Sequence, residues 1–168
     1  LSLNVRGLNK TIKQATSGFS MAAPAKIDVV FLQETYSSAQ NIKSWKAEWG
    51  DKIIGAHGTN HMILFKLKLD VNIEQTICDK NGRYILAEVL VEGEKLVFLN
   101  IYAPNDQSQQ VNALDGYKYA GDKTVLGGDL NSVMNEFDKC RGRRSFEQKK
   151  TVIQEMKTLM RTHNLIDT

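Results

Sequence analysis

The sequence predicts a mixed α/β (α+β) fold, a sandwich in which helices cover an antiparallel-rich sheet. Strand-like apolar runs recur along the chain, tight-turn residues join several of them, and a strong helical repeat follows the last run. The chain has 168 residues, 42% of them hydrophobic and 24% charged, which suits a globular protein with a substantial core. We therefore expect one domain over residues 1–168.

The strand-like runs are short and rich in β-branched, leucine and aromatic residues. They occupy residues 1–5, 27–33, 62–66, 71–78, 83–91, 95–102 and 124–127. Asn81 and Gly82 separate two of these runs and accept the positive φ of a tight hairpin. Glu92 and Gly93 mark a second hairpin. Residues 71–102 therefore predict an antiparallel meander.

The clearest helical pattern follows the last strand-like run. Ser145 and Gln148 form a capping box, which satisfies exposed N–H groups in the first turn of a helix. Apolar residues then repeat at helical spacing, at Val152, Ile153, Met156, Leu159 and Met160. This stripe predicts core packing rather than a cofactor-binding surface. Weaker patterns predict a helix within residues 9–25 and a short helix around residues 45–49, which carry both tryptophans.

Composition excludes some classes of protein and leaves others open. The net charge of +3 permits a polyanionic partner without requiring one. Cys78 and Cys140 lack metal-ligand spacing, so we interpret them as free thiols in a reducing compartment. We find no apolar stretch near the roughly 20 residues of a membrane-spanning helix, no secretory leader and no nucleotide-binding glycine motif. We expect a soluble intracellular protein with no membrane partner and no small-molecule cofactor.

Polar residues follow four of the strand-like runs at the point where each run ends. They are Asn4, then Gln33 and Glu34, then Asn100, Tyr102 and Asn105, and finally Asp129 and Asn131. If these strands share one orientation, their tips meet in one cleft, with Glu34 and Asp129 as its carboxylates. Such oxygen ligands suit Mg²⁺, whereas zinc would require Cys and His ligands. We interpret the histidines as structural or surface residues: His57, His61 and His163.

Each of these residues also has an ordinary structural explanation. Asn4 and Asn131 are types that cap turns, and Glu34 at a strand end is commonly a solvated charge. Asp129 after two glycines suits an Asx-turn. Tyr102, before Ala-Pro, suits half-buried packing with its hydroxyl in water. It is their joint occurrence at strand ends that favours a site.

Four segments, in this order, also resemble a known family: "LNVRGLN", "DVVFLQET", "FLNIYAPN" and "VLGGDLNSV". They are similar to the endonuclease domain of non-LTR (LINE-type) retrotransposons. That domain belongs to the endonuclease/exonuclease/phosphatase superfamily, together with the apurinic endonucleases and DNase I. The resemblance covers essentially the whole chain and implies a four-layer α/β sandwich, two packed mixed sheets flanked by helices. It also implies Mg²⁺-dependent (or Mn²⁺-dependent) nicking of target DNA for retrotransposition, and a nuclear location.

The same resemblance implies a role for each matching residue. Glu34 would hold the metal, with Asn4 beside it, and Asp129 would orient or deprotonate the attacking water. The remaining residues would bind phosphate oxygens or that water and complete the local hydrogen-bond network: Tyr102, Asn105 and Asn131. In this chemistry the metal neutralises charge on the phosphate while a carboxylate aligns the nucleophile.

The densest basic cluster lies before the last helical pattern: Lys139, Arg141, Arg143 and Arg144. As a loop beside the cleft it would supply salt-dependent contacts to DNA phosphates. A solvated loop that precedes a helix explains it equally well. Basic residues just before a helix N-terminus oppose the helix dipole, which slightly favours an outside partner.

The chain departs from the family pattern in several places. The family carries an Asp-His pair that stabilises the transition state, and no such pair occurs in the 168 residues. Leu130 replaces a usual Phe, and residues 111–123 look too short for the helix expected there. We therefore expect a domain incomplete at its C-terminus, weak or absent nicking by this chain, and self-association if these residues are the whole protein. The alternative is a non-catalytic module that binds nucleic acid or protein, with a phosphatase or phospholipase less favoured.

Overall fold

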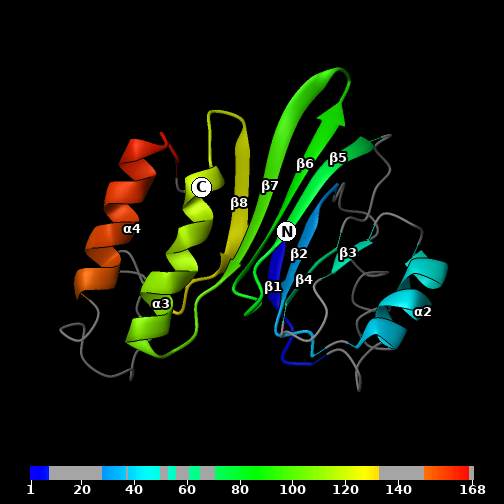
Figure 1. Cartoon of the computed structure of the whole chain (residues 1–168), viewed down its shortest axis with the longest axis horizontal. Helices are drawn as coiled ribbons and strands as arrows, with labels where there is room; N and C mark the ends of the chain where they lie inside the picture. The colour runs from blue at the N-terminus through cyan, green and yellow to red at the C-terminus, as the bar shows by residue number, and fades with distance from the viewer. Residues whose placement is uncertain are drawn as a thin grey trace.

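The computed structural model describes residues 1–7, 28–36, 38–49, 53–55, 61–64, 71–132 and 150–166, and its strands form two four-stranded sheets (Figure 1). The first sheet has the strand order β1-β2-β4-β3. Its strands are β1 (Ser2–Asn4), β2 (Val30–Gln33), β3 (Ile53–Gly55) and β4 (His61–Leu64). β1 and β2 run parallel, whereas β4 is antiparallel to β2 and to β3, so the sheet is mixed.

The second sheet contains the predicted meander. Its strands, in spatial as well as chain order, are β5 (Val71–Cys78), β6 (Tyr84–Val91), β7 (Glu94–Tyr102) and β8 (Thr124–Asp129). β6 is antiparallel to both β5 and β7, which confirms the meander, and β8 runs parallel to β7. Glu92 and Gly93 have φ of 50° and 84°, the two positive values that a two-residue type I′ hairpin turn requires.

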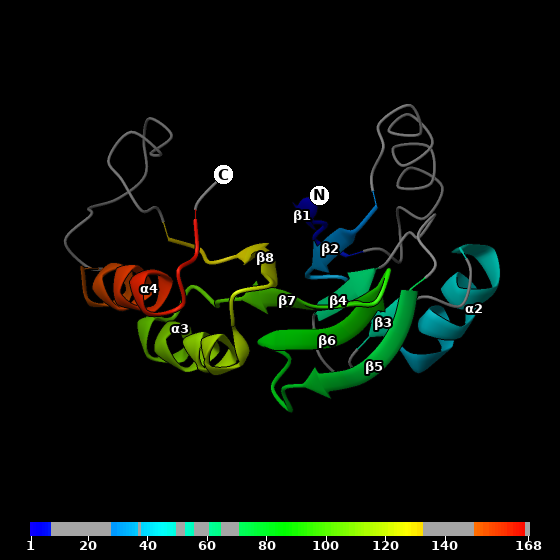
Figure 2. The ribbon, with the colours of Figure 1, turned by 90° about the horizontal axis from the view of Figure 1, so that it is seen from above.

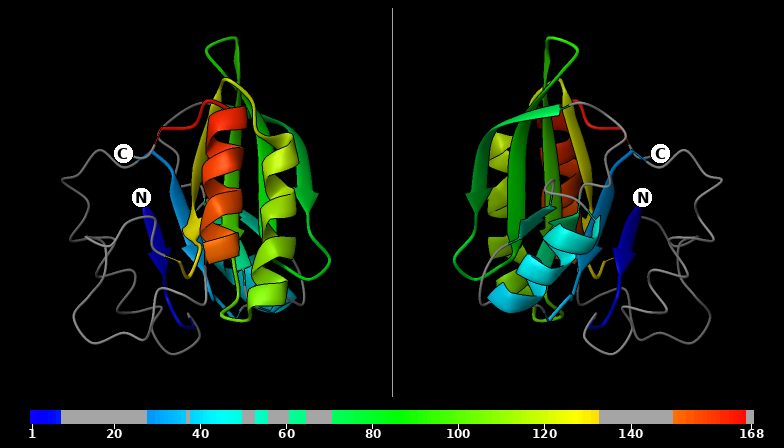
Figure 3. Two further views of the ribbon diagram at one scale, coloured as in Figure 1. Left: turned by 90° about the vertical axis from the view of Figure 1, so that its left-hand side faces the viewer. Right: turned by 90° about the vertical axis from the view of Figure 1, so that its right-hand side faces the viewer.

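Helices lie on both outer sides of the paired sheets and complete four layers (Figure 2). α3 (Gln107–Ala113), the 3₁₀ helix η1 (Leu114–Tyr119) and α4 (Lys150–Thr162) lie on the side of the second sheet, and α2 (Ala39–Trp49) lies beside β3 on the other side (Figure 1). In Figure 3 the left-hand view faces the layer of α3 and α4, and the right-hand view faces α2. The predicted four-layer sandwich is confirmed. None of the helices described is long and apolar enough to span a membrane.

Two apolar clusters hold the layers together, one on each face of the second sheet. Between the sheets pack Phe31, Ile54, Val71, Ile85, Ala87, Val89 and Phe98. Against the helices pack Tyr84, Leu86, Leu99, Ile101, Ala103, Ala113, Leu114, Tyr117, Val152 and Met156. β6 sends alternate residues into the two clusters, so its sequence is apolar along most of its length. Both faces of the second sheet are therefore covered.

Some local structure differs from the sequence prediction. Part of residues 111–123, expected to be too short for a helix, belongs to α3 and η1. Short helices are stable when they bury an apolar face, and this segment buries Val111, Ala113, Leu114 and Tyr117 against the second sheet. β3 was not predicted, because three residues are too few for a periodic pattern. Residues 45–49 lie in α2 as predicted, whereas the helix expected within 9–25 and the capping box at 145–148 fall outside the described residues.

Candidate active site

The ends of β1, β2 and β8 bring one carboxamide and two carboxylates together. Asn4 Nδ2 donates a hydrogen bond to Glu34 Oε1 at 2.9 Å and a second to Asp129 Oδ2 at 2.7 Å. Asn4 ends β1, Glu34 follows β2, and Asp129 ends β8. Since β1 and β2 belong to one sheet and β8 to the other, the candidate site lies where the two sheets meet.

Two parallel strand pairs produce this meeting. β1 pairs with β2 in the first sheet, and β7 pairs with β8 in the second. The strands of a parallel pair deliver their C-terminal ends to one edge of the sheet. The contact between Asn4 and Asp129 joins the two edges. The strand ends therefore meet across the boundary between the sheets, not along the edge of one sheet.

Left-handed backbone turns aim several of the side chains. Glu34 has a φ of 53°, Arg6 of 47° and Asn131 of 46°, a region that costs conformational energy for a residue with a Cβ. Arg6 N donates to Asn4 Oδ1 at 3.2 Å, and Gly7 N donates to Glu34 O at 2.6 Å. The turn after β1 is thus bonded both to the side chain that ends β1 and to the residue that follows β2.

The two glycines before Asp129 allow β8 to lie close to its neighbours. A Cβ on Gly127 would lie 2.5 Å from the Phe31 ring, in the core between the sheets. A Cβ on Gly128 would lie 2.0 Å from the carbonyl oxygen of Ile101 on β7. Both distances are shorter than real Cβ contacts, so a side chain at either position would displace the strand that carries Asp129.

A turn holds the segment that follows β8. Asp129 Oδ1 accepts a hydrogen bond from Asn131 N at 2.9 Å, as in an Asx-turn, while Oδ2 of the same carboxylate faces Asn4. Asn131 Nδ2 donates to Ala103 O at 2.9 Å, and Gln110 Nε2 donates to Asn131 O at 3.4 Å. The turn role of Asp129 is therefore compatible with a role in the site. Phosphate or water binding by Asn131 stays a prediction.

Tyr102, the last residue of β7, also meets Glu34. Burial, then the hydrogen bond to Glu34 and the charge of Glu34, raise the pKa of Tyr102 to about 12. Its hydroxyl is therefore protonated at neutral pH and able to donate. Tyr36 OH donates to Glu34 Oε2 at 3.4 Å. Tyr36 was absent from the sequence prediction, and its only signal was its place two residues after Glu34.

Gln33 and Asn100 do not line the cleft, and in this respect the sequence prediction was wrong. Their residue exposures are 1% and 2%, and Gln33 Nε2 donates to Asn100 Oδ1 at 2.7 Å. Side chains alternate along a strand, so Gln33 takes the same face as Phe31, which packs between the sheets.

The other predicted contacts stay predictions. Asn105 is exposed in the segment between β7 and α3. The basic cluster falls outside the described residues: Lys139, Arg141, Arg143 and Arg144.

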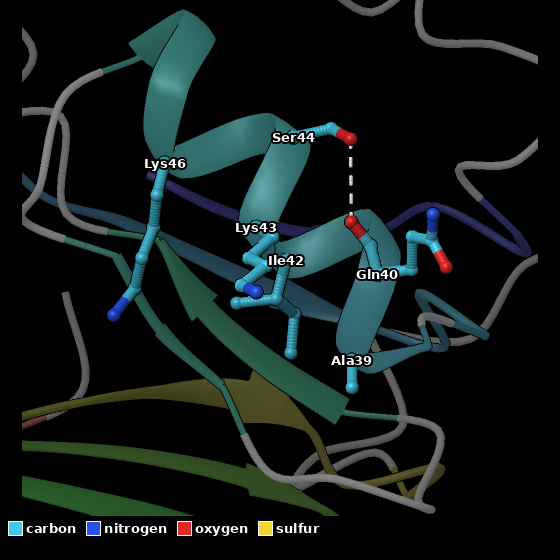
Figure 4. Close-up of a pocket in the computed structure, with 6 residues that line it drawn as sticks. All are labelled: Ala39, Gln40, Ile42, Lys43, Ser44 and Lys46. Carbon is cyan, nitrogen blue, oxygen red and sulfur yellow. Dashed lines mark hydrogen bonds between the residues drawn. The ribbon is translucent and has the colours of Figure 1, made fainter.

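A separate hollow runs along α2 (Figure 4). It is lined by Ala39, Gln40, Ile42, Lys43, Ser44 and Lys46. In Figure 4 the dashed line marks the hydrogen bond from Ser44 Oγ to Gln40 O, 3.2 Å long, within the helix. The hollow contains none of the predicted site residues, so we keep it apart from the candidate site.

Within the described residues, the two carboxylates have no ion-pair partner. The ion pairs found there join Arg83 with Asp79, Lys95 with Glu88 and Lys123 with Glu94. The same residues contain no group of three or more His, Cys, Asp or Glu placed to hold a metal. The donor set still fits a hard divalent cation. Glu34 and Asp129 offer carboxylate oxygens, while Asn4 turns its Nδ2 toward them and its Oδ1 toward Arg6 N. Mg²⁺ commonly takes one or two carboxylates and completes its shell with water and phosphate oxygens.

The profile of the Endonuclease/Exonuclease/phosphatase family matches residues 1–156. This match covers most of the chain, and the chain therefore belongs to that family. It includes every strand that contributes to the candidate site.

Solved structures share the fold. D. rerio TDP2, complexed with a single-strand DNA product, is 22% identical with a TM-score of 0.55, over 79% of this chain and 60% of that one. The endonuclease domain of TRAS1, a telomere-specific non-LTR retrotransposon, is 14% identical with a TM-score of 0.52, over 96% and 68%. A β-hairpin deletion mutant of Staphylococcus aureus β toxin is 14% identical with a TM-score of 0.54, over 99% and 72%. The chain thus spans only 60% of the TDP2 chain.

Proposed function

We propose that this chain is a divalent-metal-dependent phosphodiesterase of the LINE-type endonuclease group, which nicks one strand of DNA. The observation that carries the proposal is the contact of Asn4 with both Glu34 and Asp129, at 2.9 and 2.7 Å. It gathers two carboxylates from different sheets around one neutral amide, and this negative centre attracts a cation and, through it, a phosphate. The family membership supports a phosphodiester substrate.

The residues of the site suit in-line attack on a phosphodiester. A divalent cation bound at Glu34 and Asn4 would supply positive charge to the phosphate. Asp129, on the other sheet, orients the attacking water or accepts its proton, and Asn131 N fixes that carboxylate at 2.9 Å. Tyr102, whose hydroxyl is protonated at neutral pH and whose pKa is raised further by burial and by Glu34, donates a hydrogen bond at the same edge. Groups fixed in this way need little reorganisation during the reaction.

DNA is the substrate that we favour over a small phosphate ester. One structure with this fold, D. rerio TDP2, was solved with a single-strand DNA product, and another is the TRAS1 retrotransposon endonuclease domain. The net charge of +3 and the basic cluster of residues 139–144 suit a polyanion. The four sequence segments that resemble LINE-type endonucleases favour a chromosomal target and a nuclear location.

Nicking of supercoiled plasmid tests the proposal. We expect Mg²⁺-dependent nicking that is slow, because the sequence contains no Asp-His pair. Glu34→Ala should abolish it, because the metal loses its carboxylate ligand. Glu74→Ala, at an exposed carboxylate on β5, is the matched control and should leave the rate unchanged. Equal rates for the wild type and Glu34→Ala would overturn the proposal.

A Mg²⁺ titration of thermal stability separates the competing functions. A ligand at a hundred times its Kd stabilises the fold by about 2.7 kcal/mol, so the melting temperature should rise with Mg²⁺ in the wild type and not in Glu34→Ala. A flat titration with intact DNA binding would identify a non-catalytic binding module. Faster hydrolysis of a small phosphate ester than of DNA would identify a phosphatase.

A further inference from the structure

The candidate site is divided between two sheets whose mutual offset has to be fixed. Glu34 and Asn4 come from the first sheet, and Asp129 comes from the second. Most of the contact between the sheets is apolar: Phe31, Ile54, Val71, Ile85, Ala87, Val89 and Phe98. Apolar contact holds layers together without direction, and such cores lose uniqueness before they lose stability. Besides the Asn4–Asp129 hydrogen bond within the site, a further directional contact between the sheets would set the offset.

The buried pair Gln33 and Asn100 makes such a contact. Gln33 Nε2 donates to Asn100 Oδ1 at 2.7 Å, and Asn100 Nδ2 donates to Leu32 O at 3.0 Å. Asn100, on β7, therefore holds both a side chain and a backbone carbonyl of β2. Gln33 Nε2 also donates to Ser2 Oγ on β1 at 3.1 Å. Three strands from two sheets are tied at one buried point, where the exposures of Gln33 and Asn100 are 1% and 2%.

In the sequence, Gln33 and Asn100 each lie within two positions of a predicted site residue. Gln33 immediately precedes Glu34, and Asn100 lies two positions before Tyr102. Gln33 is also the register partner of Asn4 across β1 and β2. A change in the length or direction of the Gln33–Asn100 hydrogen bond would therefore be passed through one or two residues to the site.

We propose that Gln33 and Asn100 are positioning residues, an inter-sheet clamp that sets the distance between the carboxylates of Glu34 and Asp129. The inference rests on the proposed function for its kinetic readout, but metal binding tests it without turnover. If the pair served only stability, well-packed apolar side chains of similar volume would replace it without loss at the site, because buried polar groups often contribute little net stability.

Two sets of variants distinguish these roles. The double variant Gln33→Met with Asn100→Leu keeps the volume and removes all three side-chain hydrogen bonds of the pair. Gln33→Asn alone shortens one side chain by one methylene, and Gln33→Asn with Asn100→Gln restores the combined length with the lengths exchanged. Gln154→Met, at an exposed glutamine on α4, is the matched control. The readouts are the Kd for Mn²⁺ by titration, the kcat and KM for plasmid nicking, and the melting temperature.

We expect Gln33→Met with Asn100→Leu, and Gln33→Asn alone, to weaken Mn²⁺ binding and lower kcat, each by about 10–100-fold, the usual effect of losing a group that orients a metal ligand. The KM for DNA should stay within about twofold. The exchanged pair should recover most of the lost affinity, a rescue that a role in stability alone does not explain.

Wild-type Mn²⁺ affinity in the folded apolar double variant would overturn the clamp. So would a failure of the exchanged pair to recover affinity lost in Gln33→Asn. If the apolar double variant does not fold, the comparison of Gln33→Asn with the exchanged pair decides the question alone. A wild type that binds Mn²⁺ without nicking DNA refutes the proposed function and leaves the clamp to be judged by Kd. A wild type that binds no Mn²⁺ refutes both.

Discussion

Asp79 on the one hand, and Glu34 with Asp129 on the other, have opposite kinds of hydrogen-bond partner. Arg83 holds Asp79 with Nε at 2.7 Å from Oδ2 and Nη2 at 3.0 Å from Oδ1, and Arg83 N adds a bond of 3.1 Å. The carbonyl of Arg83 accepts from Tyr102 N at 2.7 Å, so this turn adjoins the candidate site. Glu34 and Asp129 share one neutral amide instead.

The partner of a carboxylate decides whether the carboxylate serves structure or is open to a ligand. A bidentate guanidinium cancels the charge of Asp79 and satisfies both of its oxygens, which leaves nothing to attract a ligand. A carboxamide satisfies hydrogen bonds but cancels no charge. Within the described residues, the two carboxylates gathered by an amide have no cation opposite them, and their oxygens are available to a metal ion. Substitutions at Asp129, Arg83 and Asp79 test this distinction.

Asp129→Asn should separate activity from stability most strongly. The substitution preserves shape but removes the carboxylate that we propose to act on the attacking water, so the cleavage rate should fall about 10²–10⁴-fold. The free energy of unfolding should change by only about 1 kcal/mol, because Asp129 loses one hydrogen bond and has no ion pair with any described residue. Single-turnover cleavage and urea denaturation measure the two quantities. A large loss of stability with cleavage intact would contradict the distinction.

Arg83→Met should lower stability and leave metal binding nearly unchanged. Loss of the guanidinium leaves Asp79 without its charged donor and should lower the free energy of unfolding by about 1.5–3 kcal/mol. Arg83→Lys keeps the charge but not the planar fork, so its loss should be intermediate. Mg²⁺ affinity should stay within about twofold of the wild type, because the pair holds no metal. Urea denaturation and Mg²⁺ titration of the same samples check this. A tenfold loss of Mg²⁺ affinity would show that the pair of Arg83 and Asp79 contributes to metal binding.

Lowering the pH should gradually remove the contribution of Asp79 to the free energy of unfolding. This is the smallest of the three expected effects. The hydrogen bond to Arg83 lowers the pKa of Asp79 below its ordinary value. The associated stability is therefore fully present above the ordinary pKa and is lost as pH falls through the lowered pKa. The difference in unfolding free energy between the wild type and Asp79→Asn, about 1 kcal/mol or more at pH 7, should shrink as pH falls toward 3. A difference that stays constant with pH would show that the charge of Asp79 contributes nothing.

Much of the second sheet was predictable because its information is local. The turn at Glu92 and Gly93 and the apolar runs on either side predict β6 and β7 without reference to the rest of the chain. α3 and η1 were missed because they depend on distant partners: Tyr117, for example, is buried in the cluster on the helical face of the second sheet. Three-residue β3 has too little pattern to be recognised.

For the site, the sequence indicated which strands end in polar residues but not where each side chain points. Asn4 and Glu34 meet, as expected, but Gln33, next to Glu34, turns inward. Direction depends on which face of β2 meets the second sheet, and that is a tertiary fact. Tyr36 was missed for the same reason. Only the folded chain shows that its hydroxyl reaches Glu34.

The bond between Asn4 and Asp129 spans 125 positions of sequence. Loop closure over such a span is entropically costly and slow, so this contact belongs among the last to form as the chain folds. During synthesis, a ribosome has to release the chain past Asp129 before the two carboxylates meet. Glu34 and Asp129 therefore stay apart until β8 has docked beside β1.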